Sequence, residues 1–243
     1  MAVLQTLDRI LQSQGFGTRR ECQQLCDYGL VTVNGELIEN PSTKLNPTGA
    51  MFTVDGQDWP YHERAYVALY KPADYECSMK PKHYPSVMNL LALPLRLREV
   101  QPVGRLDADT TGLLLFTDDG QFIHRCTSPK KMVPKVYAVT TKHPVDQATA
   151  EQLVKGVILN DDPDTVYAQA CEVKGEHLLH LTITEGKYHQ VKRMLAAVSN
   201  RVEALERIAI GQFQMPADWK IGSWHWLTSE QLKQIETPIV LKN

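Results

Sequence analysis

The chain has 243 residues, of which 43% are hydrophobic and 22% are charged. This is the composition of a globular protein, and the length exceeds that of one typical domain. The longest unbroken apolar run, residues 65–70, has six residues, whereas a bilayer-spanning helix needs about twenty. Residues 1–10 also lack the basic and apolar segments of a secretory signal. We therefore expect a cytoplasmic protein without a membrane partner.

The five cysteines are an odd number and include no Cys-x-x-Cys pair. This pattern indicates reduced thiols rather than a disulfide framework, and it predicts no structural zinc site.

The formal net charge of −2 conceals a segregation of charge along the chain. Residues 121–143 contain five basic and no acidic residues, while residues 144–185 contain two basic and eight acidic ones. Residues 64–105 are also basic, with seven basic and three acidic residues. A polyanion could therefore meet a local positive surface on a nearly neutral protein. The alternative is that each basic stretch is a solvated loop.

Residues 1–58 have the pattern of a small module with two helices and a hairpin. Four apolar residues recur at helical spacing: Leu4, Leu7, Ile10 and Leu11. Thr18 and Glu21 have the spacing of a capping box, which predicts a second helix that ends near Gly29. The dipeptide Asn34-Gly35 lies between two short apolar runs and predicts a β-hairpin. We expect a linker at 59–64 and a larger domain at 65–243.

The larger domain has more strand-like than helical segments. The expected strands are 65–70, 112–117, 136–141, 165–173 and 177–184. The expected helices are 145–155, 188–198 and 229–235. Because strands and helices do not alternate regularly, we expect an α+β fold with a mostly antiparallel sheet rather than a doubly wound fold.

The segment with the most chemistry is 104–120, with the sequence GRLDADTTGLLLFTDDG. It has the form of a charged, glycine-bounded loop that leads into a buried strand, and such a loop could hold a carboxylate rigidly against a pocket. The alternative, on spacing alone, is that Asp107 and Asp109 only make local turn hydrogen bonds.

This segment resembles the signature of the pseudouridine synthases, in the branch that acts on small-subunit ribosomal RNA. Further matching motifs follow in family order: Lys71-Pro72, Lys135-Val136-Tyr137 and residues 183–194 (ITEGKYHQVKRM). The N-terminal module resembles the αL RNA-binding domain, a small unit of helices and a hairpin. The resemblance covers nearly the whole chain.

The resemblance implies the roles of particular residues. Three match catalytic positions of the family: Asp107, Tyr137 and Lys192. Asp107 matches the catalytic aspartate, Tyr137 the tyrosine that stacks on the target uracil, and Lys192 the cation that pairs with the aspartate. Four more match or flank substrate-binding positions: Arg105, Ile183, Lys187 and Arg193. Many relatives have arginine at the positions of Lys187 and Lys192, and lysine cannot form the bidentate fork of arginine.

Two further basic residues, Arg19 and Arg20, lie in the first turn of the capped helix. Free amides and guanidinium groups together could bind RNA phosphate there. The alternative is that both are solvated charges. On either reading we expect their replacement by alanine to change thermal stability little.

The implied reaction is isomerisation of one uridine to pseudouridine in 16S small-subunit rRNA, either free or in an assembling particle. It consumes nothing, and we expect no cofactor, no metal and a monomeric enzyme. Three alternatives stay open: a pseudouridine synthase for large-subunit rRNA, a non-catalytic rRNA-binding assembly factor, and a hydrolase that cuts the same N-glycosidic bond. The hydrolase would need a second carboxylate, for which Asp109 is the candidate.

Overall fold

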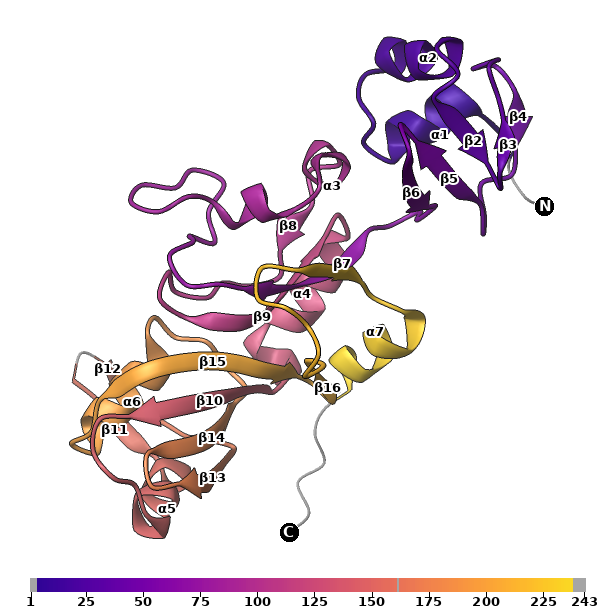
Figure 1. The fold of residues 1–243 in the computed structure, drawn as a ribbon. Coiled ribbons are helices and arrows are strands. Elements are labelled where there is room, and N and C mark those ends of the chain that lie inside the picture. The colour runs from indigo at the N-terminus through magenta and orange to yellow at the C-terminus, as the bar shows by residue number, and fades with distance from the viewer. Residues whose placement is uncertain (1–3, 161, 238–243) are drawn as a thin grey trace. The chain divides into compact units, whose positions relative to one another are not determined.

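The computed structural model describes residues 4–160 and 162–237 of the chain (Figure 1). The chain divides into two compact units. The first contains the chain up to Ala65 together with Leu91–Gln101, and the second contains Tyr66–Leu90 and the chain from Pro102 onward. The sequence-based boundaries differ from this division, because they assign 59–64 to a linker and 91–101 to the second domain, whereas both segments belong to the first unit.

The first unit combines short helices with a four-stranded antiparallel sheet of order β3-β2-β5-β6. Its helices are α1 (Leu7–Ser13), α2 (Arg19–Asp27) and α3 (Leu93–Leu97). Its strands are β1 (Gln5–Thr6), β2 (Val31–Val33), β3 (Glu36–Leu37), β4 (Lys44–Leu45), β5 (Met51–Val54) and β6 (Gln57–Pro60). Strand β6 extends two residues into the segment expected to be a linker.

Local signals in this unit act as the sequence predicts. The Thr18 side chain accepts from the Glu21 amide and the Glu21 carboxylate accepts from the Thr18 amide, so the capping box is confirmed. The hairpin is also confirmed, since Val33 pairs with Glu36 across Asn34 and Gly35, both of which have positive φ. Leu4 differs from expectation, because it precedes β1 and is exposed rather than on the buried face of α1.

The segment Leu91–Gln101 belongs to the first unit through both packing and polar contacts. Leu95 and Val100 are fully buried. The Arg98 guanidinium donates to the carbonyl oxygens of His62 and Glu63 at 2.9 and 3.1 Å. It also donates to Gln14 Oε1 at 3.1 Å. The segment is therefore held at the end of α1 and at the chain that follows β6.

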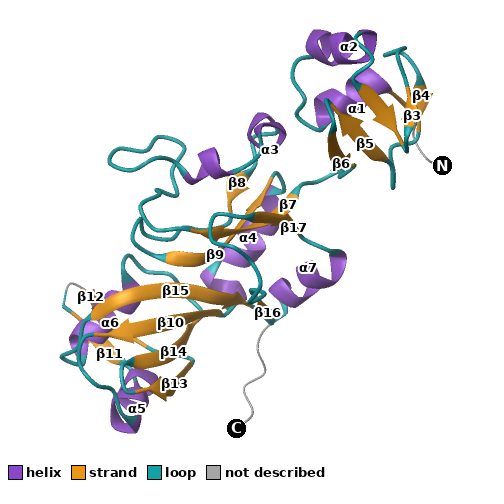
Figure 2. Ribbon diagram, viewed as in Figure 1, coloured by secondary structure: helices purple, strands orange, loops and turns teal. Residues whose placement is uncertain are grey.

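The second unit is built on a mixed sheet of nine strands (Figure 2). Its main path is β13-β14-β10-β15-β9-β7-β17, and only the β9–β15 pairing is parallel. The strands of the path are β7 (Tyr66–Lys71), β9 (Thr111–Thr117), β10 (Lys135–Thr141), β13 (Ala170–Gly175), β14 (Leu178–Ile183), β15 (Val202–Ile210) and β17 (Trp224–Trp226). Shorter strands are β8 (Gln101–Pro102), β11 (Val157–Leu159), β12 (Asp162–Val166) and β16 (Phe213–Gln214). The expected α+β fold with a mostly antiparallel sheet is confirmed.

Helices cover this sheet and connect its strands. They are α4 (Gly120–Thr127), α5 (Gln147–Lys155), α6 (Gln190–Ala197) and α7 (Ser229–Glu236), with 3-10 turns at Val87–Leu90 and Pro129–Lys131. A core cluster of buried side chains includes Leu113 and Leu115 of β9, Phe122 of α4 and Ile235 of α7. Among the described residues, no helix is long and apolar enough to cross a membrane.

Several segments differ from the sequence-based expectation, among them the helices α3 and α4 and the strand β17, which were not expected. The expected strand 165–173 is divided between β12 and β13. The long strand β15 was not expected, because its buried positions Leu205, Arg207 and Ala209 include a cation and a small residue. The sequence therefore lacks the clear alternation of apolar and polar residues that would have predicted a strand here.

Candidate active site

A buried lysine binds the backbone of the loop that carries Asp107. Lys71, at the end of β7, has no exposed surface. Its ammonium donates to the carbonyl oxygens of Pro72, Ala108 and Thr110 at 2.9, 3.0 and 2.8 Å. Burial lowers the pKa of Lys71, although neighbouring acidic groups oppose this. Two of these charge-assisted bonds, to Ala108 and Thr110, hold the backbone of the Asp107 loop.

The strand that follows the loop passes unusually close to its parallel neighbour. Gly112 of β9 is the register partner of Arg207 in β15 and has a φ of +105°. A Cβ at this position would lie 2.3 Å from the Arg207 carbonyl oxygen. Glycine is therefore required here by both its backbone conformation and the available space.

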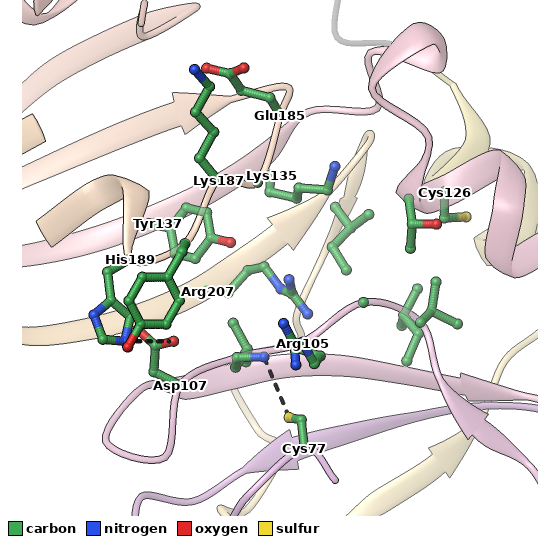
Figure 3. Close-up of a pocket in the computed structure, with 18 of the residues that line it drawn as sticks. Cys77, Arg105, Asp107, Cys126, Lys135, Tyr137, Glu185, Lys187, His189 and Arg207 are labelled. Carbon is green, nitrogen blue, oxygen red and sulfur yellow. Dashed lines mark hydrogen bonds and ion pairs between the residues drawn. The ribbon is translucent and has the colours of Figure 1, made fainter. Parts of the chain in front are cut away.

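Asp107 lies between the side chains of Lys192 and His189, and Figure 3 shows the His189 ring beside its carboxylate. Lys192 Nζ is 3.2 Å from Asp107 Oδ2, and His189 Nε2 is 3.5 Å from Asp107 Oδ1. The Asp107 side chain is 30% exposed, so its carboxylate is reachable from the pocket. The expected pairing of Lys192 with Asp107 is present in the structure.

Lys192 also binds Asp109, and more closely than it binds Asp107. Its ammonium is 2.7 and 2.9 Å from the two carboxylate oxygens of Asp109. Partial burial opposes ionisation of Asp109, but the hydrogen bonds and charge of Lys192 outweigh it and lower the pKa of Asp109. Burial likewise opposes the charge on Lys192, yet the two carboxylates raise the pKa of Lys192. Asp109 therefore does more than shape a turn, which was its expected role.

His189 was not assigned any role from the sequence. It precedes α6 with a left-handed backbone, φ 48°, and its ring stacks on Tyr188 with centroids 3.8 Å apart. This conformation directs the imidazole to Asp107, which the helical spacing of the sequence does not reveal. The position of the His189 ring depends on this left-handed backbone conformation, which the amino-acid sequence does not predict.

Tyr137 and Ile183 belong to neighbouring strands of the central sheet. Tyr137, in β10, is 7% exposed, and Ile183, at the end of β14, is 2% exposed. Lys135 is the register partner of Ile183 on one side and of Ile210 on the other. The aromatic ring and the aliphatic side chain therefore contribute an apolar wall beside Asp107.

These residues surround a pocket of about 470 Å³ that lies within the second unit. Asp107, Tyr137 and His189 line it, together with the basic side chains of Arg105, Lys135 and Arg207. Figure 3 shows the three basic side chains between Asp107 and Cys126. Ile183 and Lys192 line an adjoining smaller hollow that shares Asp107 and Tyr137. A volume of this size falls in the range of sites that bind small ligands.

The two other expected substrate-binding residues are engaged with the protein itself. The Lys187 ammonium donates to Asp162 Oδ2 of β12, and Figure 3 shows it directed away from Asp107. Arg193 donates from Nη1 to the Tyr188 carbonyl at 3.0 Å, which supports the turn before α6. Their contact with RNA stays a prediction.

In the first unit, Arg19 and Arg20 differ in their surroundings. Arg19 Nε donates to Asp8 Oδ2 at 2.7 Å, and the Asp8 side chain is only 1% exposed. Arg20 is exposed in the same turn of α2. The contact revises the expectation for Arg19: we now predict that its replacement lowers thermal stability, because Asp8 would lose its cationic partner.

The site thus offers the partly exposed carboxylate of Asp107, a lysine whose ammonium lies 3.2 Å from it, and an aromatic wall. Within the described residues, no cluster of three or more histidine, cysteine, aspartate or glutamate side chains is arranged to hold a metal. The arrangement suits nucleophilic or general-base chemistry on a flat, polar ring held against Tyr137.

Comparison with known proteins gives consistent matches over most of the chain. The profile of the RNA pseudouridylate synthase family matches residues 65–197, and that of the S4 domain matches residues 5–50. The ribosomal small subunit pseudouridine synthase A of Escherichia coli K12 is 42% identical over 206 residues, covering 84% of this chain and 88% of that protein.

Two further matches cover still more of the chain. The protein of the same name from Pasteurella multocida is 35% identical over 227 residues, covering 93% of this chain and 97% of that protein. A crystal structure of a pseudouridylate synthase superposes with a TM-score of 0.67 at 32% identity, covering 95% of this chain and 99% of that one.

Proposed function

This chain belongs to the RNA pseudouridylate synthase family, and we propose that it isomerises one specific uridine of 16S small-subunit rRNA to pseudouridine. It is an isomerase of ribosomal RNA, with an S4 domain preceding the catalytic domain. Support for the small-subunit target comes from the relatives named above, whose similarity spans both domains.

We propose Asp107 as the catalytic carboxylate. The observation that carries this proposal is its position: a partly exposed carboxylate, 3.2 Å from Lys192 Nζ, in the wall of the pocket that Tyr137 also lines. A nearby cation favours the ionised form of a carboxylate. The negative charge is what either a nucleophile or a general base requires.

The apolar wall supplies the second part of the proposal. A uracil ring stacked on Tyr137 and packed against Ile183 would be held edge-on to Asp107, since all three residues line one hollow. The target nucleotide must leave its base stack to enter, at a cost of a few kcal/mol. Arg105 is exposed at the same pocket, and we assign it to the space that the base vacates or to the flanking RNA.

Lys192 holds two carboxylates at once, which suits a lysine better than the arginine found in many relatives. A guanidinium would favour one bidentate pair, whereas the ammonium is 3.2 Å from Asp107 and 2.7 Å from Asp109. We assign Asp109 to positioning Lys192, not to chemistry.

The test compares Asp107→Asn with Asp109→Asn on rRNA transcripts. Pseudouridine is measured by mass spectrometry after chemical labelling, and RNA affinity and thermal unfolding are measured in parallel. We expect Asp107→Asn to form no product while keeping its fold and RNA affinity. Asp109→Asn should keep substantial activity, because Lys192 retains Asp107. Near-normal activity of Asp107→Asn would refute the catalytic assignment.

The same assay separates the alternatives. A hydrolase would release free uracil, and a non-catalytic assembly factor would bind rRNA without forming pseudouridine. Mapping pseudouridine across all rRNA of cells that lack the gene distinguishes 16S from large-subunit targets. A missing pseudouridine only in large-subunit rRNA would contradict the proposed target.

We propose that the first unit binds folded rRNA and raises the local concentration of the substrate. Arg20 is its best phosphate-binding candidate, because it is exposed in the first turn of α2, whereas Arg19 is bound to Asp8. We propose a cytoplasmic, monomeric enzyme whose substrate is free rRNA or an assembling particle.

A further inference from the structure

Arg207 is a buried cation to which the proposed reaction assigns no role. Its residue is 3% exposed and it lies in the middle of the central sheet, in β15. Its Nε donates to the Leu113 carbonyl at 2.7 Å, but its buried Nη2 has no hydrogen-bond partner. A buried donor without a partner costs free energy, so this nitrogen points to a ligand that the pocket receives.

The surroundings of Arg207 are cationic. Lys135 and Arg105 line the same pocket, and neither Lys135 nor Arg207 has an ion pair within the part of the chain that the structure describes. The acidic residues of the pocket are engaged elsewhere. Glu185 accepts from the Gln190 side chain, Glu76 accepts from three amides of its own loop, and Asp107 faces Lys192.

The register of the sheet places these cations beside the aromatic wall. Tyr137 in β10 is the register partner of Arg207 in β15. Directly opposed residues of neighbouring strands have Cβ atoms about 5 Å apart on one face of the sheet. Lys135 is two residues before Tyr137 and therefore shares that face. All three residues line one pocket, so a ring that stacks on Tyr137 would lie beside both cations.

Two RNA groups could meet these cations: a backbone phosphate or the uracil itself. The backbone continues on both sides of the target nucleotide, so its phosphates stay near the mouth of the pocket. Only the base projects inward. The deep position of Arg207 therefore favours the carbonyl oxygens of uracil over a phosphate.

The negative charge that these cations could stabilise develops on the base during the reaction. When the bond between ribose C1′ and uracil N1 breaks, its electron pair leaves with the base, and the charge spreads over N1 and the two carbonyl oxygens. The electron-poor C1′ then faces the Asp107 carboxylate. After the base turns, a ring electron pair forms the bond from C5 to C1′, the C5 proton is lost and N1 gains a proton. Nothing is consumed.

We propose that Arg207, assisted by Lys135, binds a carbonyl oxygen of the extruded uracil and stabilises the uracil anion formed when the glycosidic bond breaks. This inference rests on the proposed function. Arg207 donates hydrogen bonds and transfers no proton, because a guanidinium keeps its charge in proteins. Preorganised donors aimed at developing charge stabilise it most in a site from which water is excluded.

The test uses leaving-group chemistry. Arg207→Met and Lys135→Met are compared with the wild-type enzyme on rRNA that carries either uridine or 5-fluorouridine at the target position. Fluorine withdraws electrons and makes the departing base a more stable anion. Loss of the intact target nucleoside is measured in single turnovers at saturating enzyme, together with RNA affinity. Lys142→Met is the matched control, because Lys142 is exposed and directly follows β10.

We expect Arg207→Met to lower the single-turnover rate on uridine by about 10²–10³-fold, as the loss of one oxyanion-hole donor does. Lys135→Met should lower it less. With 5-fluorouridine both losses should shrink at least tenfold, and RNA affinity should hardly change. If Arg207→Met does not fold, Lys135→Met decides the question, since no hydrogen bond of the described protein depends on its ammonium.

Equal rate losses on the two substrates would overturn the inference, because a structural role does not depend on the leaving group. A loss confined to RNA affinity would also overturn it and would instead indicate a phosphate site. If the wild-type enzyme forms no pseudouridine from the uridine substrate, the proposed function fails and this inference fails with it.

Discussion

Replacing Arg19 should destabilise the first unit, whereas replacing its neighbour Arg20 should not. Asp8 is buried in α1 and its carboxylate accepts four hydrogen bonds: from Thr6 Oγ1 at 2.5 Å, the Arg9 amide at 2.8 Å, Arg19 Nε at 2.7 Å and Gln23 Nε2 at 2.9 Å. Arg19→Ala removes the only one of these donors that carries a formal charge. Arg20→Ala removes an exposed charge from the same turn of the same helix.

The expected magnitude follows from the burial of the two partners. A hydrogen bond to a charged group contributes about 1.5–3 kcal/mol. The Arg19 side chain is 53% exposed, so water partly replaces it and the lower end of the range applies, about 1.5 kcal/mol. In a unit of this size, that corresponds to about 6–12 °C in the unfolding temperature. For Arg20→Ala we expect a change within about 0.5 kcal/mol.

The pH dependence of this effect has a defined sign. Burial opposes ionisation of Asp8, but hydrogen bonds from Thr6, Arg19 and Gln23 outweigh it and hold the pKa of Asp8 far below its usual value. A carboxylate whose pKa is lowered by folding contributes stability above its unfolded pKa, about 3.9, and loses that contribution as the pH falls. The difference between the wild-type protein and Arg19→Ala should therefore shrink below about pH 4.

The assay is calorimetric unfolding of the full chain, combined with hydrogen exchange of the amides in α1 and α2. Exchange in these helices should accelerate in Arg19→Ala and remain unchanged in Arg20→Ala, which should lose rRNA affinity instead. Equal exchange rates and unfolding temperatures in the two variants would refute the role assigned to the Arg19–Asp8 pair.

Three further predictions concern the second unit. Gly112→Ala should lower the free energy of unfolding by more than about 3 kcal/mol, because its Cβ would lie 2.3 Å from the Arg207 carbonyl oxygen; a soluble variant with wild-type denaturant stability would contradict this. Lys71→Met should cost at least about 2 kcal/mol and abolish pseudouridine formation, since the Pro72 carbonyl and the Ala108 and Thr110 carbonyls of the Asp107 loop lose their donor; normal activity would show that the loop keeps its conformation without Lys71. Burial and the charge of Arg207 lower the pKa of Lys135 to about 8, with Cys126 opposing. Because Lys135 loses its proton above this pH, the turnover rate should fall as the pH rises through 8. The same decline in Lys135→Met would show that Lys135 is not its cause.

Local signals predicted local structure well. The Thr18–Glu21 capping box and the Asn34-Gly35 turn depend on residues three or fewer positions apart, so their residue types determine the outcome. The strand after Asp107 was equally clear, because all but the first residue of β9 are buried and most are large and apolar. The resemblance to the pseudouridine synthases, confirmed by the family match, rested on motifs of this kind.

Features that depend on tertiary contacts were missed. Arg207 meets Leu113 and Tyr137 only because β15 inserts between β9 and β10. Lys71 belongs to an apolar strand, and nothing nearby in sequence indicates that its ammonium is buried under the Asp107 loop. The catalytic roles of Asp107 and Tyr137 stay predictions, which the variants above test.

The segment Leu91–Gln101 affects when the first unit can fold during synthesis. The later segment packs with residues up to Ala65 in that unit and supplies the buried Leu95 and the Arg98 hydrogen bonds to His62 and Glu63. The ribosome must therefore add 36 more residues (101 − 65) after Ala65 before the unit is complete. At about 5–20 residues per second, that delay lasts about 2–7 s. During this interval the first unit lacks the contacts of a segment that follows β7 in sequence, so its native contacts are completed only after part of the second unit has been synthesised.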